Sequence, residues 1–124
     1  MKPIEKKLNK AFRDYICVRD PVCLFMGLRG DCAGSPTECA HILSGRHDST
    51  RWLPQNAVGL CHICHMHQHS DEPKLLEDWF KAEYNEMIWY AMFRLHNQAV
   101  RFTQDELEDH LKWLKEETGR ARRG

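Results

Sequence analysis

The densest group of chemically versatile side chains lies in residues 60–69, LCHICHMHQH, which contain two cysteines and four histidines. Thiolates and imidazoles are the side chains that bind zinc and related transition metals most readily. Cys61-x-x-Cys64 has the spacing at which a tight turn directs two thiolates to one tetrahedral ion, as in a zinc knuckle. A structural site of this kind needs two further ligands, which must come from elsewhere in the chain.

The other cysteines offer those ligands. Cys17 ends an amphipathic segment and is expected to be a core or boundary thiol, whereas Cys23 and Cys32 flank a glycine-containing loop, CLFMGLRGDC, that can fold back as a second, wider knuckle. Cys39 is the main alternative to Cys32. Buried free thiols would also fit, because cysteine is among the most buried residue types. Long loops in a small domain favour metal, so we assign one structural zinc to Cys23, Cys32, Cys61 and Cys64.

The histidines suggest a second metal site. If a helix begins near residues 61–64, His65 and His69 are one turn apart and share a face. Two imidazoles at this spacing are the usual way in which a helix offers two nitrogens to one ion. Two residues of the predicted strands are expected to face this pair, His41 at the end of ECAHIL and Asn56 at the start of NAVGL.

Few elements are needed to position these side chains. The spacing of apolar residues predicts an N-terminal helix over residues 1–19. Residues 20–72 should hold the metal sites, with short strands around 38–43 and 56–60. After Asp71-Glu72-Pro73, which looks like a helix start, helical periodicity covers 73–118, with a capping-box signature at Thr103–Glu106, and 119–124 are expected to fray. These elements amount to a single small α+β domain over residues 1–124.

Composition narrows the setting. The chain has 124 residues and no segment near the roughly 18 apolar residues that a membrane helix needs. The N-terminal MKPIEKKLNKAFRDY lacks the apolar stretch of a signal peptide, and six cysteines without one indicate a reducing, cytoplasmic compartment. Residues 1–60 carry nine Lys and Arg against six Asp and Glu, and residues 61–118 carry six against twelve. This split permits a basic working face, although solvated helix surfaces explain it equally well.

His41, Asn56 and His65 resemble the signature residues of the HNH nucleases. Asn56 lies 15 residues after His41, His65 lies 9 further on, and His69 another 4. The wider context is similar to phage and prophage HNH proteins of the NinG/Rap recombination type. The segments that carry this resemblance, between about residues 12 and 118, are RDPVC, CAHIL, SGRHDSTRW, LPQN and LCHICH.

The resemblance implies a ββα-metal (His-Me finger) core, in which two antiparallel strands joined by a loop pack on a helix. A zinc-knuckle site and flanking helices complete the expected fold. The resemblance also implies that the protein acts in the cytoplasm of a bacterial or phage-infected host cell. The sequence departs from the family at two places. Met26 stands where the first knuckle usually has its second cysteine, so Cys32 is expected to replace the lost thiol. Ala40 stands where many members carry a metal-binding Asp or His before the base. Water, phosphate or a loop residue such as His47 or Asp48 is expected to complete the shell.

The resemblance also implies the catalytic roles. His41 is the expected general base, since a neutral imidazole accepts protons near pH 7. His65 and His69 would hold a catalytic divalent ion, Mg²⁺, Mn²⁺, Ni²⁺ or Zn²⁺. Asn56 would either hold the loop after His41 through backbone hydrogen bonds or offer its carbonyl to the metal.

Two arginines of the loop between the strands, Arg46 and Arg51, are expected to meet DNA phosphates, although solvated loop arginines are as common. Trp52 is expected to anchor this loop. The expected function is a divalent-metal-dependent DNA endonuclease or nickase in phage DNA recombination or processing, and an enzyme that cuts both strands is expected to be a homodimer. Two alternatives are a non-catalytic zinc-stabilised DNA-binding module, which Ala40 favours, and a protein-interaction domain that uses zinc for stability.

Overall fold

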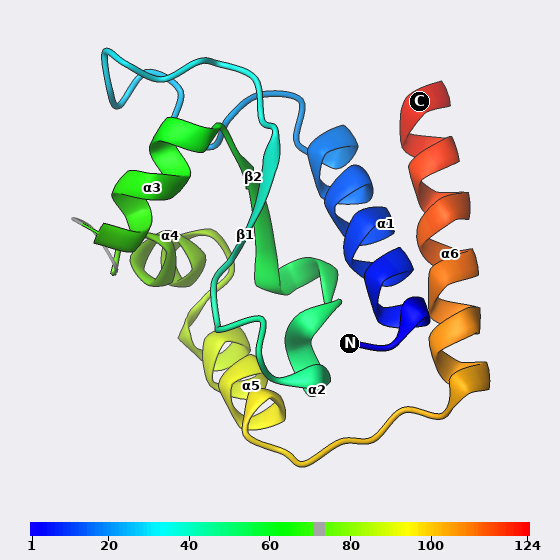
Figure 1. The fold of residues 1–124 in the computed structure, drawn as a ribbon. Helices are drawn as coiled ribbons and strands as arrows, with labels where there is room; N and C mark the ends of the chain where they lie inside the picture. Colours follow the sequence, from blue (N-terminus) through cyan, green and yellow to red (C-terminus); the bar gives the residue numbers. More distant parts are fainter. Residues whose placement is uncertain (71–73) are drawn as a thin grey trace.

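Helices surround two short strands in the computed structural model, which describes residues 1–70 and 74–124 (Figure 1). The elements, in chain order, are α1 (Pro3–Arg19), β1 (Glu38–His41), α2 (Asp48–Arg51), the 3₁₀ helix η1 (Pro54–Asn56), β2 (Ala57–Leu60), α3 (His62–Ser70), α4 (Leu75–Glu83), α5 (Glu86–His96) and α6 (Gln104–Arg123). The predicted α+β class is confirmed.

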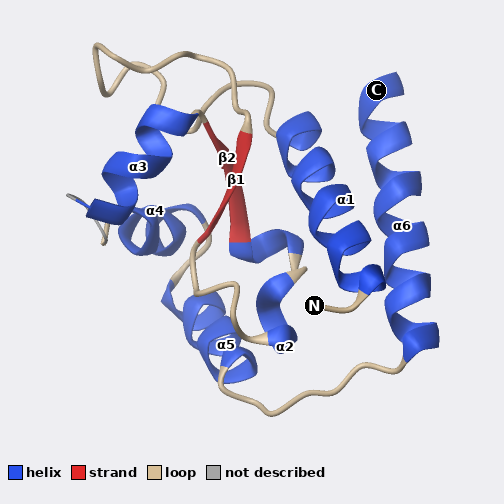
Figure 2. Cartoon of the chain, in the orientation of Figure 1, coloured by secondary structure: helices blue, strands red, loops and turns tan. Residues whose placement is uncertain are grey.

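The two strands form an antiparallel pair at the centre of the molecule (Figure 2). Glu38 pairs with Leu60 at one end and His41 with Ala57 at the other. Helices α1 and α6 lie side by side on one side of this sheet, and α3 and α4 lie on the other (Figure 1). The sheet therefore has a helical layer on each side, and β1 passes between α1 and α3.

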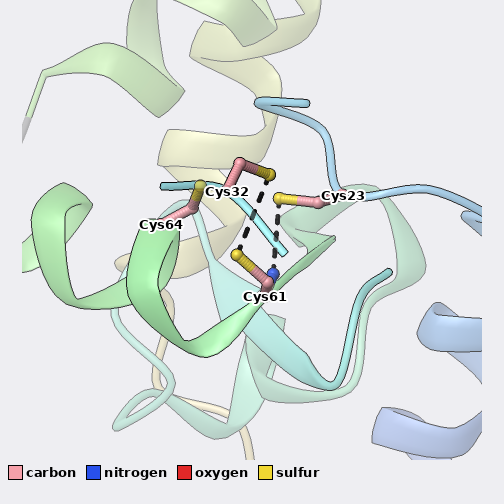
Figure 3. A group of neighbouring side chains, drawn as sticks. All are labelled: Cys23, Cys32, Cys61 and Cys64. Carbon is pink, nitrogen blue, oxygen red and sulfur yellow. Dashed lines mark hydrogen bonds between the residues drawn. The ribbon is translucent and has the colours of Figure 1, made fainter. Parts of the chain in front are cut away.

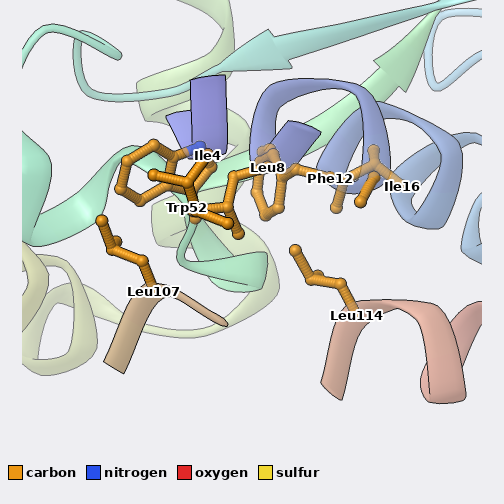
Figure 4. Packing of buried hydrophobic residues seen from close by; sticks show 9 residues of the cluster. Ile4, Leu8, Phe12, Ile16, Trp52, Leu107 and Leu114 are labelled. Carbon is orange, nitrogen blue, oxygen red and sulfur yellow. The ribbon is translucent and has the colours of Figure 1, made fainter. Parts of the chain in front are cut away.

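An apolar core joins α1, α6 and the segment before β2 (Figure 4). The predicted stripe on α1 is buried, and Leu8 and Ile16 have no exposed surface. Leu107 and Leu114 of α6 pack against it, and Trp52 closes one end. Burying aliphatic side chains of this size stabilises the fold by about 1.5–3 kcal/mol each. This packing fixes how α1 is rotated, and so decides which of its polar residues face the sheet.

The end of α1 is fastened to β2 by polar contacts. The Arg19 guanidinium donates to the carbonyls of Pro54 and Ala57 at 2.8 and 2.7 Å and pairs with Asp20 at 2.8 Å. The Asp20 carboxylate accepts from the Gly59 N–H at 2.8 Å. A Cβ at Gly59 would lie 2.9 Å from Cβ of Pro36, so only glycine allows the loop before β1 to approach β2 this closely.

Three local expectations need correction or comment. The tail does not fray at residue 119, because α6 continues to Arg123. Its last turn carries Arg120, which pairs with Glu117 at 2.9 Å, and cations in the last turn stabilise a helix through its dipole. The first strand ends at His41, two residues earlier than expected, and the predicted helix start at Asp71-Glu72-Pro73 lies outside the described residues.

The capping box at Thr103–Glu106 is confirmed, since each residue accepts the other's backbone N–H at 3.1 Å. The described helices include none that is long and apolar enough to cross a membrane.

We expect Leu114→Ala to lower the free energy of unfolding by about 2–5 kcal/mol, because the side chain is fully buried between α6 and α1 and its loss leaves a cavity. Urea unfolding followed by circular dichroism measures this loss. Lys112→Ala, an exposed position on the same helix, is the control and should change stability by less than about 0.5 kcal/mol. Equal losses in the two variants would contradict the packing described.

Candidate functional site

Four cysteines from two distant segments converge between α3 and the loop before β1 (Figure 3). The sulfur atoms of Cys23, Cys32, Cys61 and Cys64 all lie within 4.8 Å of one another. The Sγ atoms of Cys61 and Cys32 are 3.9 Å apart. A tetrahedral zinc ion with Zn–S bonds of about 2.3 Å separates its sulfurs by about 3.8 Å, so this donor set fits zinc. The predicted grouping of these four cysteines is confirmed.

The surroundings of Cys61 favour its thiolate, whereas burial raises the pKa of the Cys23 thiol and, together with hydrogen bonds among the thiols, that of Cys64. The Cys61 N–H donates to Cys23 Sγ at 3.3 Å, and the Gly34 N–H donates to Cys32 Sγ at 3.4 Å. Burial raises the pKa of the Cys61 thiol, but hydrogen bonds from the backbone of Cys64 and Ala33 and from neighbouring thiols outweigh it and bring the pKa to about 6. One thiolate is therefore present at neutral pH, which is the form that binds metal.

The choice between Cys32 and Cys39 is settled by strand geometry. Cys39 lies on β1 and packs against the α1 core, away from the other thiols. Burial raises the pKa of Cys39 to about 12, so it is a neutral thiol at physiological pH. Cys32 belongs to the cluster, and Cys17 stays a partly buried thiol on α1, as expected.

Two of the four histidines of α3 face each other. Nε2 of His65 and Nε2 of His69 are 2.9 Å apart. Nδ1 of His65 donates to Oε1 of Glu38 at 2.7 Å, and Nδ1 of His62 donates to the other carboxylate oxygen at 2.7 Å. The bond from His65, followed by that from His62, holds the pKa of the Glu38 carboxyl below its usual value. Glu38 thereby keeps the proton of His65 on Nδ1 and leaves the Nε2 lone pair directed toward His69.

This imidazole pair is a two-donor set. In residues 1–70 and 74–124, the cysteine quartet is the only group of three or more Cys, His, Asp or Glu whose ligand atoms cluster within 4.8 Å. Among the described residues no third ligand atom joins the pair, so an ion on His65 and His69 would keep positions open to water or a bound phosphate.

His41 is held with one ring nitrogen engaged. Its Nε2 lies 2.8 Å from the carbonyl oxygen of Arg51. A carbonyl only accepts, so Nε2 carries the hydrogen and Nδ1 has the free lone pair. The ring stacks on Phe12 with centroids 5.8 Å apart. Burial lowers the pKa of His41, with a further contribution from the charge of Arg51, so the ring is neutral at pH 7.

The residue at position 45 controls access to that lone pair. A Cβ on Gly45 would lie 3.1 Å from Nδ1 of His41 and 3.2 Å from Cε1. This is closer than ordinary van der Waals contact, so a larger residue would crowd the proton-accepting edge of the ring. Glycine at this position keeps the edge open.

Asn56 is completely buried at the end of η1. Its Oδ1 accepts from the Leu43 N–H at 2.7 Å, and its Nδ2 donates to the carbonyls of Leu43 and Thr50 at 2.9 and 3.1 Å. Of the two roles considered for Asn56, holding the loop after His41 matches this geometry, because the amide is occupied by backbone groups on both sides.

The residues expected to replace the ligand missing at Ala40 are directed elsewhere. Ala40 is fully buried, in an apolar cluster that includes Val58 and Leu76. The His47 ring stacks on His96 at 3.8 Å and its Nδ1 bonds the His96 carbonyl, while Asp48 lies 3.8 Å from Arg51. Of the alternatives for completing the metal shell, the loop residues His47 and Asp48 are engaged elsewhere, which leaves water and phosphate, and Glu38 is the carboxylate that reaches the histidine pair.

A groove of about 720 Å³ lies between α1 and the sheet and contains both His41 and His65. Its polar lining includes four cations, Lys6, Lys10, Arg13 and Arg51, and one carboxylate, Glu38. Of the two arginines expected to meet phosphates, Arg51 lines the groove, whereas Arg46 is exposed outside it. Trp52 is buried and its Nε1 donates to Asn9 at 2.9 Å, which confirms its predicted anchoring role.

Sequence reasoning missed five residues of this site. Glu38 and Gly45 gave no signal of their own, since their roles depend on how β1 meets α3 and on the path of the loop. The cations at positions 6, 10 and 13 do carry a signal, because their spacing places them along one side of a helix. The sequence did not indicate that this side of α1 faces the sheet, because the rotation of α1 depends on its packing against α6.

The chain was compared with known proteins. No family model, no curated protein and no solved structure matches it. The assignment of the candidate site therefore rests on the geometry described above.

We expect the purified protein to contain about one zinc ion per chain, and Cys61→Ser to lose both zinc and structure. The binding free energy of a structural zinc is on the order of 10 kcal/mol, comparable with the whole stability of a small domain. Elemental analysis and circular dichroism measure the two losses. Cys17→Ser, which lies outside the cluster, should keep both. Zinc that persists after the joint replacement of Cys61 and Cys64 by serine would end this assignment.

Proposed function

We propose that this protein is a divalent-metal-dependent DNA endonuclease or nickase of the HNH, or ββα-metal, type. One observation carries the proposal: a single groove lined by cations contains a neutral histidine with a free Nδ1 and also His65, whose ring is oriented by a carboxylate and contacts His69. The antiparallel pair β1–β2 and the following α3 agree with the arrangement that the resemblance implies.

The groove suits hydrolysis of a phosphodiester. The cationic side chains of Lys6, Lys10 and Arg51 hold the phosphate by its charge. Nδ1 of His41 takes a proton from the attacking water, whose oxygen bonds to phosphorus on the side opposite the leaving oxygen. The P–O bond to the 3′ oxygen breaks, and that oxygen is protonated from solvent. The products carry a 5′-phosphate and a 3′-hydroxyl.

The remaining residues support this step. His65 and His69 would hold a divalent ion, which supplies electrophilic stabilisation of the charge on phosphate and leaving oxygen. Glu38 fixes the tautomer of His65, and Asn56 holds the backbone after His41. The structural zinc is a separate site that stabilises the fold.

A second candidate is a zinc-stabilised module that binds DNA without cutting it. The observation that favours it is the two-donor set at His65 and His69, to which the described residues add no third ligand atom within 4.8 Å. A plasmid-nicking gel separates the two candidates, run with added Mg²⁺, Mn²⁺ or Ni²⁺ and with EDTA.

We expect His41→Ala to reduce nicking by about 10²–10⁴-fold while zinc content and circular dichroism stay unchanged, because general-base catalysis typically contributes that factor. His110→Ala, a histidine of α6 that bonds the Trp52 carbonyl outside the groove, is the control. Nicking by the wild type should stay constant through neutral pH and fall as the pH drops through a pKa that lies below the ordinary value near 6.5. Undiminished nicking by His41→Ala would assign the base role to another residue.

We expect Glu38→Gln to raise the divalent-ion concentration needed for half-maximal nicking by about 10–100-fold, the usual effect of removing a carboxylate that orients a metal-binding histidine. A titration of nicking against Mn²⁺ measures the shift. Glu77→Gln, a carboxylate on α4 that pairs with Lys81, is the matched control. If Glu38→Gln follows the wild-type curve, Glu38 does not act through His65.

A further inference from the structure

A second basic depression lies between α1 and α6, next to the groove. It has a volume of about 380 Å³ and is lined by Lys7, Lys10, Ala11, Asp14, Lys115, Thr118 and Arg122. Lys7, Lys115 and Arg122 are exposed. In the described part of the chain these three form no ion pair, whereas Lys10 pairs with Asp14 at 2.8 Å.

This second depression adjoins the groove that contains His41. Lys10 lines both depressions, so they meet across the exposed side of α1. Together they contain seven cations and only two carboxylates, Asp14 and Glu38, in a chain whose formal charge is zero. We call these seven residues the basic track: Lys6, Lys7, Lys10, Arg13, Arg51, Lys115 and Arg122.

The chemistry of the basic track fits the phosphates of a duplex better than bases. Single-strand binding relies on exposed aromatic side chains that stack on bases, and the one phenylalanine of the lining, Phe12, is 2% exposed. Reading of adenine edges uses free amide side chains. The one amide of the described lining, Asn9, already accepts from Trp52 Nε1 at 2.9 Å. Lysine and arginine side chains supply many of the contacts to phosphate oxygens, and seven of them on one surface match the charge of a duplex backbone.

We propose that the basic track binds the phosphate backbone of double-stranded DNA beside the scissile phosphate, without reading sequence, and that Lys115 and Arg122 are contacts outside the cleavage site. This inference rests on the proposed nuclease function and extends it to the form of the substrate. Helix α6 then has two roles, since its apolar side packs on α1 and its C-terminal turns extend the DNA-binding surface.

The test uses His41→Ala as the background, so that bound DNA stays intact. In that background, Lys115→Gln with Arg122→Gln is compared with Arg94→Gln plus Arg120→Gln, which removes the same charge from α5 and from the other side of α6. The dissociation constant for a duplex of arbitrary sequence is measured across a range of salt concentrations. The slope of log affinity against log salt is negative, and each lost phosphate contact makes it shallower by about 0.9. The first pair should therefore make the slope shallower by about 1.8, and the control pair should leave it unchanged.

Three results would overturn the proposal: equal slopes for the two double variants, tighter binding to a single strand than to the duplex of the same sequence, or tighter binding to duplex RNA. Nicking by the wild-type protein reports separately on the proposed function. With His41 intact, the Lys115→Gln and Arg122→Gln pair should raise KM while kcat holds, because these residues lie outside the reacting atoms. If the wild type nicks but neither slope nor KM responds, the basic track alone is refuted.

Discussion

The positions of His65 and His69 depend on the cluster of four cysteines. Two of its thiols come from the loop before β1 and two from the junction of β2 and α3, so the cluster joins segments that are distant in the sequence. The carbonyl of Cys61 accepts the N–H of His65 at 3.0 Å, so Cys61 directly precedes α3 and is bonded to its first turn. Helical geometry then fixes the direction of His65 and, one turn later, of His69. A zinc ion on these thiols would therefore set where the imidazole pair lies relative to β1.

The opposite wall of the groove depends on ordinary hydrophobic packing. Leu8, Phe12 and Ile16 rotate α1 so that its basic side is turned toward His41 and its apolar side toward α6. Phe12 takes part in both, since it belongs to this core and also stacks on the His41 ring. The two walls have different sources of stability, one from sulfur ligands and the other from buried apolar area. Glu38, on the strand between them, is the side chain that couples β1 to α3.

The sequence predicted the parts of this arrangement that local rules control. Cys61 and Cys64, the histidines one turn apart and the capping box at Thr103 all follow from short-range spacing. It predicted less where distant elements meet. Successive residues of a strand point to opposite faces, so Ala40 and His41 could not both face the groove. The contact of Glu38 with α3 could not be predicted, because it depends on the distance between β1 and α3. The cysteine cluster sets that distance.

The environment of His41 explains how a histidine beside arginines can act as a base. Its engaged nitrogen donates to a backbone carbonyl and not to a carboxylate. A carboxylate in that place would stabilise the imidazolium and raise the pKa, whereas burial and the charge of Arg51 act in the opposite direction. Arg51, one of the cations that we propose to hold the phosphate, therefore adds to the effect of burial in lowering the pKa of the ring. Because Nε2 is engaged, Nδ1 is the nitrogen left to accept a proton, and the absence of a side chain at Gly45 keeps it accessible from the groove.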